Sequence, residues 1–164
     1  MKNLTATICL TIAVLLGSAV VSWSADFQKG LNAAKSGDFA TALRELKPLA
    51  EQGHARAQSN LGVMYYKGLS VPKNNKTAVK WYRLAAEQGF APAQSNLGSM
   101  YGNGMGVIQD NVYAHMWWNI AASSGNSKNA SKNRDIVEKR MTPTQIAEAQ
   151  KLARECVRKK YKGC

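Results

Sequence analysis

The sequence lacks most of the residue combinations that catalysis and metal binding require. Its only histidines, His54 and His115, have no cysteine, aspartate or glutamate at metal-ligand spacing on a shared helix, and we interpret both as ordinary surface or edge residues. A string of the form S-x-x-K begins at Ser70, but Pro72 places it in a loop, whereas β-lactamase-like chemistry needs the serine at a helix start. The partner motifs S-D-N and K-T-G are missing. We therefore predict no enzyme, no metal and no cofactor, with a β-lactamase-like hydrolase as the remotest alternative.

Acidic residues are also scarce. The chain has 22 lysines and arginines against ten acids, and the formal charge is +12. The charge is uneven, because residues 90–125 contain no lysine or arginine, whereas residues 126–164 carry eleven basic residues and four acids. Such a charge implies attraction to anionic surfaces. The alternative is a solvated face that only maintains solubility.

The one long apolar stretch lies at the N-terminus. Lys2 supplies a positive n-region, Leu4 to Val21 are largely apolar, and small residues stand at Ser22 and Ser24. This pattern predicts a secretory signal peptide that is cleaved after Ser24. An uncleaved membrane anchor is the alternative, since the run has about the minimum length for spanning a bilayer. We expect a periplasmic or secreted protein, which argues against nucleic acid as a partner.

Cysteine is rare, and only Cys156 and Cys164 remain once residues 1–24 are removed. Two cysteines in an exported chain favour a disulfide. An unbroken helix between them would hold them about 12 Å apart, too far to bridge. A bond therefore requires the tail at residues 161–163 to fold back, and a free or intermolecular thiol is the alternative.

A block of thirteen residues recurs at a spacing of 36. AEQGHARAQSNLG runs from Ala50 to Gly62 and AEQGFAPAQSNLG from Ala86 to Gly98. A period of this length is typical of helical units stacked into a solenoid. We divide the chain into a signal peptide (1–24), an N-terminal partial-repeat hairpin (25–53), two repeats (54–89 and 90–125), and a degenerate half-repeat with a capping helix (126–164).

Each repeat has the pattern of two short helices. In the first repeat they are predicted near 55–67 and at 77–88, with Gly68 and Gly89 as stop signals. Gly62, in the middle of a helix, indicates a close approach by a neighbouring helix. Thr142 and Gln145 form a capping box for a final helix. Its apolar stripe is expected to seal the exposed end of the stack; it comprises Ile146, Ala149, Leu152 and Ala153.

These residues resemble the Sel-1-like repeat family, relatives of tetratricopeptide repeats. The pattern A-x-x-x-L-G-x-x-Y, a glycine-bearing loop and A-x-x-W-Y-x-x-A-A-x-x-G is present at Ala57, Leu61, Gly62, Tyr65, Gly68, Ala78, Trp81, Tyr82, Ala85, Ala86 and Gly89. The second copy matches at Ala93, Leu97, Gly98, Tyr101, Gly104, Gly106, Val107, Asp110, Ala114, Trp117, Ala121, Ala122 and Gly125. The first copy departs from the family loop at Leu69-Ser70 and Asn74. The resemblance implies an all-α, right-handed superhelical solenoid of antiparallel helix pairs with a C-terminal capping helix.

The resemblance also implies a binding surface, because the first helices of such repeats line a concave face used for protein or peptide contacts. By register, the candidate ligand-binding residues are Arg56, Ser59, Asn60, Val63, Tyr66, Lys67, Ser95, Asn96, Ser99 and Asn103. The asparagines Asn60 and Asn96 either hold a peptide backbone or tie neighbouring helices together. Tyr66 and Lys67 become Gly102 and Asn103 in the next copy, a loss of bulk that either shapes a pocket or has no role.

We therefore predict a monomeric, non-catalytic adaptor of the bacterial envelope that binds a protein or peptide through this concave face. The alternative is an envelope-binding module that holds peptidoglycan or anionic lipid through its basic surface. A core role is predicted for the aromatic set Trp81, Tyr82, Trp117 and Trp118, rather than stacking on carbohydrate.

Overall fold

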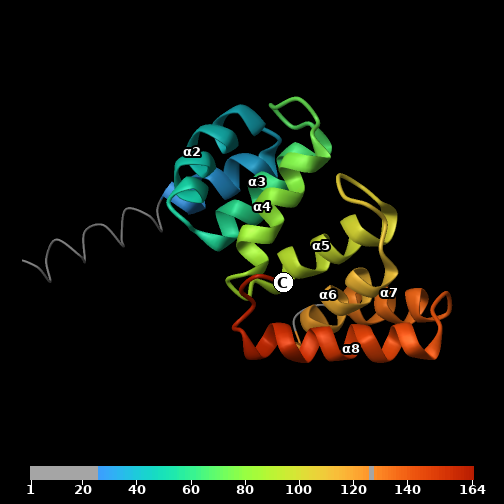
Figure 1. Cartoon of the computed structure of the whole chain (residues 1–164). Coiled ribbons are helices and arrows are strands. Elements are labelled where there is room, and N and C mark those ends of the chain that lie inside the picture. The colour runs from blue at the N-terminus through green and yellow to red at the C-terminus, as the bar shows by residue number, and fades with distance from the viewer. Residues whose placement is uncertain (1–25, 126–127) are drawn as a thin grey trace, which may run out of the picture.

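The computed structural model describes residues 26–125 and 128–164, and every regular element in these ranges is an α-helix (Figure 1). The predicted signal peptide lies outside the described residues. The helices are 26–36, α2 (Phe39–Glu51), α3 (Ala55–Lys67), α4 (Asn75–Ala86), α5 (Ala91–Asn103), α6 (Asn111–Ser123), α7 (Lys128–Glu138) and α8 (Pro143–Arg158).

Neighbouring helices pack as antiparallel pairs. α3 pairs with α4 to form the first full repeat, and α5 pairs with α6 to form the second. α4 packs on α5, and α2 on α3, so the pairs stack in chain order (Figure 1). Two repeated glutamines tie each first helix to the pair before it: Gln58 Nε2 donates to Ala50 O and Gln94 Nε2 to Ala86 O. The predicted all-α solenoid of helix pairs is confirmed.

The second helix of the first repeat begins two residues earlier than predicted, at Asn75, and its counterpart in the second repeat begins 36 residues later, at Asn111. The reason is the residue before it, because Asn74 Oδ1 accepts from Thr77 N at 2.9 Å and Asp110 Oδ1 accepts from Val112 N at 2.8 Å. These side chains satisfy backbone donors that the first turn leaves unpaired. Asn74 therefore caps its helix as Asp110 does, although it departs from the family pattern.

The mid-helix glycines make room for aromatic rings. A Cβ atom on Gly62 would lie 2.6 Å from Tyr82 Cδ1, and one on Gly98 would lie 2.8 Å from Trp118 Cδ1. The two helices of a pair can therefore approach closely, as the sequence predicts. Of the predicted core aromatics, Tyr82, Trp117 and Trp118 are buried and Trp81 is partly buried.

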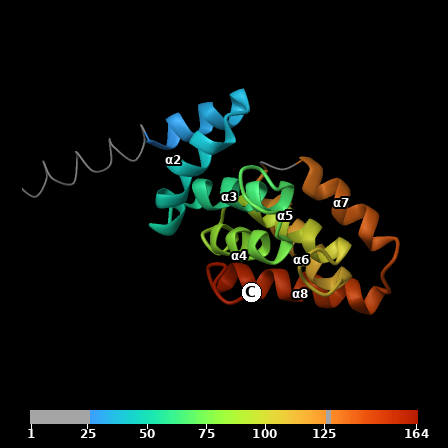
Figure 2. The ribbon, with the colours of Figure 1, turned by 90° about the horizontal axis from the view of Figure 1, so that it is seen from above.

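The final helix begins as predicted, with both hydrogen bonds of the Thr142–Gln145 capping box present. Its position differs from the prediction, because α8 packs along α6 and not over the end of the stack. Figure 2 shows α7 and α8 on opposite sides of α6. The buried side chains Ala153 and Cys156 join the core that holds Met116 and Ile120. The apolar stripe thus covers the outer face of α6, and the half-repeat helix α7 forms the end of the solenoid.

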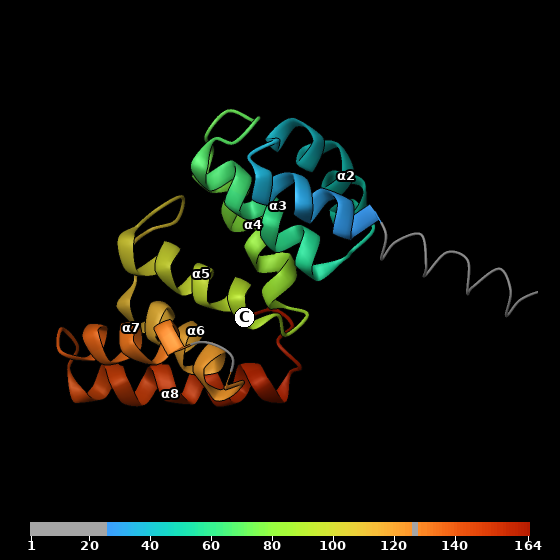
Figure 3. The same ribbon diagram turned by 180° about the vertical axis from the view of Figure 1, so that it is seen from behind.

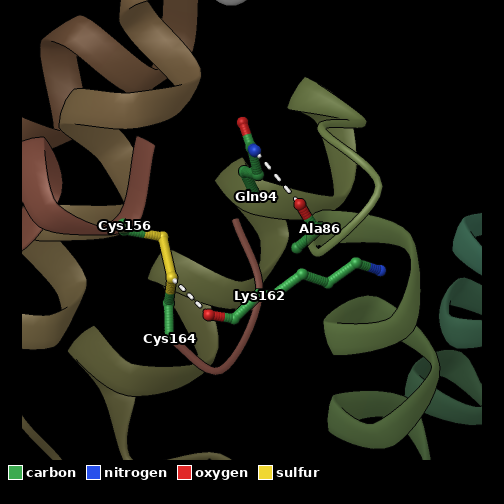
Figure 4. Close-up of a disulfide and its surroundings, with 5 residues drawn as sticks. All are labelled: Ala86, Gln94, Cys156, Lys162 and Cys164. Atoms are coloured by element: carbon green, nitrogen blue, oxygen red, sulfur yellow. Dashed lines mark hydrogen bonds between the residues drawn. A yellow bond between two sulfur atoms is a disulfide. The ribbon is translucent and has the colours of Figure 1, made fainter. Parts of the chain in front are cut away.

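The C-terminal tail folds back on itself. Lys160, Tyr161 and Gly163 have φ values of 51°, 66° and 66°, and the sulfurs of Cys156 and Cys164 are bonded with a Cα–Cα distance of 5.7 Å (Figure 4). The Tyr161 ring lies against Gly89. Figures 1 and 3 accordingly show the C-terminus beside the turn between α4 and α5, one repeat back from α7.

Candidate functional site

The first helices α3 and α5 carry the residues of the predicted concave face, and several of those on α3 make internal contacts. The Arg56 guanidinium lies 4.9 Å from the centroid of the Phe27 ring, so this side chain reaches back to the N-terminal helix. Asn60 Nδ2 donates to the Arg56 carbonyl in its own helix at 2.8 Å. Ser59 is buried, which corrects its placement on the exposed surface. The Asn60 amide bonds neither a neighbouring helix nor a loop, so the alternative in which it ties these elements together is wrong, and its role in holding a peptide backbone stays a prediction.

The end of α3 is filled by an aromatic ring. Tyr66 is half-buried, and the Lys73 ammonium lies 6.0 Å from its ring centroid. Val63, three residues before Tyr66, is half-buried, and Lys67 is exposed at the helix end. The residues predicted on this helix therefore form a bulky surface.

The α5 portion of the face is polar, uncharged and more open. Ser95, Asn96 and Ser99 are half-buried, and Asn103 is exposed. Ser99 Oγ donates to Ser95 O, and Asn103 Nδ2 donates to Ser99 O at 2.8 Å. Each of these bonds leaves polar atoms of the side chain available for a ligand. α5 has no charged residue.

An open pocket of about 210 Å³ lies where α5, α6 and α7 meet. Two of the predicted residues line it, Ser99 and Asn103. The remaining lining comes from residues that were not predicted as a site: Gly102, Trp118, Asn133, Ile136, Val137 and Arg140. The sequence signal for this pocket is the loss of bulk from Tyr66 to Gly102, for which the sequence leaves open a role in shaping a pocket.

The floor of the pocket depends on that loss of bulk. A Cβ atom on Gly102 would lie 2.9 Å from Trp118 Cη2, so the tryptophan ring takes up the space above the glycine. Trp118 Nε1 donates to Ser95 O at 3.1 Å, which fixes the ring against α5. Where α3 has Tyr66, α5 has Gly102, and the Trp118 ring from α6 lies over this glycine. The surface above the ring becomes a depression.

The wall that α7 contributes is one helical face. Asn133, Ile136, Val137 and Arg140 follow the spacing i, i+3, i+4 and i+7, with Arg140 just beyond the helix end. Ile136 is 43% exposed and therefore places apolar surface at the pocket. Arg140 is exposed and belongs to none of the ion pairs found among residues 26–125 and 128–164.

The acids of α7 are engaged elsewhere. Asp135 pairs with Arg134 at 2.8 Å, and Glu138 Oε1 lies 2.6 Å from His115 Nε2. His115 is fully buried on α6, so the interpretation of this histidine as a surface residue was wrong. It joins α6 to α7 through its contact with Glu138. His54 is half-buried and caps α3, because its Nδ1 accepts from Ala57 N at 3.2 Å.

The structure places the S-x-x-K string and the possible metal-ligating side chains of the described residues. Ser70 lies in the loop between α3 and α4 with φ 55°, and not at a helix start. The described residues contain no cluster of three or more histidine, cysteine or acidic side chains that could hold a metal ion. None of the described helices has the length and apolarity needed to cross a membrane.

The family model named Sel1 repeat matches residues 55–90 and 91–126. A protective antigen of uropathogenic Escherichia coli strains with an SLR fold is 32% identical, with a TM-score of 0.80 over 85% of this chain. A Sel1 repeat protein from Oxalobacter formigenes is 37% identical, with a TM-score of 0.63 over 66% of this chain. No curated protein matches the sequence.

The chain therefore contains two Sel1 repeats, and its fold is that of the SLR proteins. Proteins of this class are generally protein-interaction modules built on a repeat scaffold that is typically non-catalytic. This chain spans 30% of the length of the Escherichia coli protein and 44% of the Oxalobacter formigenes protein.

Proposed function

We propose that this protein is a non-catalytic adaptor that binds a protein or peptide segment through the concave face of its repeats. The observation that carries the proposal is the pocket between α5, α6 and α7, with the Trp118 ring as its floor and the exposed Ile136 on its wall. Buried aromatic floors and exposed apolar side chains supply binding energy, whereas carboxamides such as Asn103 and Asn133 orient a peptide backbone.

The proposal includes export to the bacterial periplasm or beyond through the leader at residues 1–24, and a monomeric state. The two cysteines that remain after the leader is removed form a disulfide in the structure, which suits an oxidising compartment. Cell fractionation with antibody detection tests the location. A full-length product in the cytoplasm would contradict it.

The test of the concave site is site-specific photocrosslinking in the native envelope. A photoreactive phenylalanine analogue at Asn103 stands in the pocket, and the same analogue at Gln150 stands on the exposed side of α8. We expect a discrete protein adduct from position 103 and none from position 150. Mass spectrometry then identifies the partner. Adducts of equal pattern from both positions would contradict a concave site.

A second candidate function is attachment to peptidoglycan or anionic lipid through the basic surface. It is favoured by the outer side of α8 and the tail, where the following basic residues are exposed: Lys151, Arg154, Arg158, Lys159, Lys160 and Lys162. Salt separates the two functions, because association through exposed charges weakens strongly as the Debye length falls to about 3 Å at 1 M salt. Envelope retention that is lost in high salt would favour this second function, whereas groove binding should persist.

A further inference from the structure

The concave pocket has a chemical selectivity that follows from its charge. We propose that it recognises an acidic side chain of an extended peptide, with the carboxylate held by Arg140 and a neighbouring apolar side chain on Ile136 and Trp118. This inference rests on the proposed concave-face function and names the partner segment that the face accepts.

Arg140 lies at the edge of the pocket and has no ion-pair partner among the residues that the structure describes. The nearest acids along its helix are Asp135 and Glu138, and these contact Arg134 and His115. α5, on the opposite wall, contributes no charge, so nothing among the described pocket residues neutralises the guanidinium. A guanidinium forms its strongest hydrogen bonds with a carboxylate, and frequently forms two in parallel.

The other pocket groups match a peptide that carries such an acid. The carboxamide of Asn133 has no hydrogen bond to the rest of the described chain, and that of Asn103 uses one N–H on Ser99 O, so a donor and an acceptor remain on both. The Ile136 side chain stands four residues before Arg140 and lines the same pocket. An acidic residue next to an apolar one would therefore meet complementary groups at both positions.

The pocket is open, which favours an internal side chain over a chain terminus. It is lined by α5 and α7 on two sides, with Trp118 of α6 between them. The second repeat has no lysine or arginine, and the C-terminal region has eleven. Attraction for an acidic segment is therefore directed to the α7 side of the groove.

The test uses a random dodecapeptide library displayed on phage and selected against the immobilised protein. We expect the wild type to enrich peptides in which aspartate or glutamate adjoins an apolar residue. Arg140→Gln should lose the acidic preference, whereas Arg154→Gln, which removes an exposed arginine of α8 outside the concave pocket, should keep it.

A selected peptide is then synthesised with its acidic residue, with glutamine in place of that residue, and with an amidated C-terminus. We expect the glutamine form to bind about tenfold or more weakly, since a hydrogen bond to a charged group is the stronger kind. Amidation should leave the affinity unchanged. Dependence on the free C-terminus would overturn the side-chain assignment.

The outcomes separate this inference from the proposed function. Peptides selected without acidic preference, or the same peptides selected by Arg140→Gln, would overturn the inference and leave a concave peptide site standing. Loss of the preference in Arg154→Gln would move the recognition to the outer basic surface and overturn it as well. If no peptide is selected by the wild type, both the inference and the concave site are contradicted.

Discussion

The two full repeats are close copies in sequence, yet they present different surfaces. In the first, α3 carries the Tyr66 ring on its concave side, and the smaller Tyr82 comes across from α4. In the second, α5 has no side chain at Gly102, and the Trp118 ring from α6 lies over this position. A pocket is present above the ring. Losing the ring of the first helix while enlarging that of the second turns a filled surface into a binding depression.

The outer sides differ in the same way. Leu84 is 45% exposed on α4, whereas its counterpart 36 residues later, Ile120, is 3% exposed because α8 lies over it. Lys80, exposed on α4, corresponds to the buried Met116 on α6. The second repeat is thus covered by α8 on one side and by α7 on the other. Five predictions test this comparison, from the largest expected effect to the smallest.

The outer-face difference predicts unequal costs for equivalent truncations. Ile120→Ala should lower the free energy of unfolding by about 2–5 kcal/mol, because it empties buried space beneath α8. Leu84→Ala should cost less than about 1 kcal/mol, since much of that side chain is already in water. Urea titrations of both variants give the comparison. Equal losses would show that α8 does not cover the second repeat in solution.

The disulfide is predicted to hold α8 against the second repeat. Removing it in a Cys156→Ser, Cys164→Ser variant should cost at most about 2–3 kcal/mol, the loop-closure value for a ring of this size. Amide hydrogen exchange should quicken in α8 and α6 while α3 keeps its protection. Reduced wild type should match the variant, which itself should not respond to reductant. Uniform loss of protection would contradict a local role.

The pocket floor is predicted to depend on a pair of residues. Gly102→Ala should cost about 1–3 kcal/mol, because the new Cβ atom meets the Trp118 ring. In a Trp118→Tyr background the same change should become neutral or stabilising, as alanine is otherwise favoured over glycine within a helix by about 1 kcal/mol. A double-mutant cycle measures this coupling. Additive effects would show that the ring does not occupy the space over Gly102.

The two interhelical loops differ at one left-handed position. Ser70 has φ 55° where the second repeat has Gly106 with φ 75°. Ser70→Gly should stabilise the protein by about 0.5–1 kcal/mol, since a side chain is strained in this conformation. The reverse change, Gly106→Ser, should destabilise it, because a Cβ atom there would lie 2.5 Å from the Asn75 carbonyl. Thermal unfolding checks both signs, and destabilisation by Ser70→Gly would contradict the strain.

The smallest effect is confined to alkaline pH. Burial raises the pKa of the Tyr82 phenol far above its ordinary value, with a smaller contribution from Tyr66. Its contribution to stability is complete below the unfolded-state pKa near 10 and falls as the pH rises above that value, because only the unfolded chain then releases the proton. Tyr82→Phe should therefore lose less stability between pH 9 and 11 than wild type. Parallel urea midpoints across that range would contradict this origin.

The fold follows closely from local signals in the chain. The stop glycines and the capping residues fix the backbone within a few residues of their own positions, and the 36-residue period repeats these signals in the second copy. The predicted helices therefore lie within two residues of the observed ones. The candidate site could be predicted from the sequence only in part. Ser99 and Asn103 line the pocket, but Arg56 and Ser59 turn out to make internal contacts, since helical register alone does not say what a neighbouring element covers.

The sequence by itself determined the repeat architecture, because its periodicity, caps and mid-helix glycines each specify a short-range geometry. Only the tertiary structure decided that α8 lies on the outer face of α6, that His115 is buried against Glu138, and that α7 brings Arg140 beside the α5 groove. The reason is that the repeat decays after residue 125, and packing between elements distant in the chain then depends on side-chain fit that no periodic pattern records.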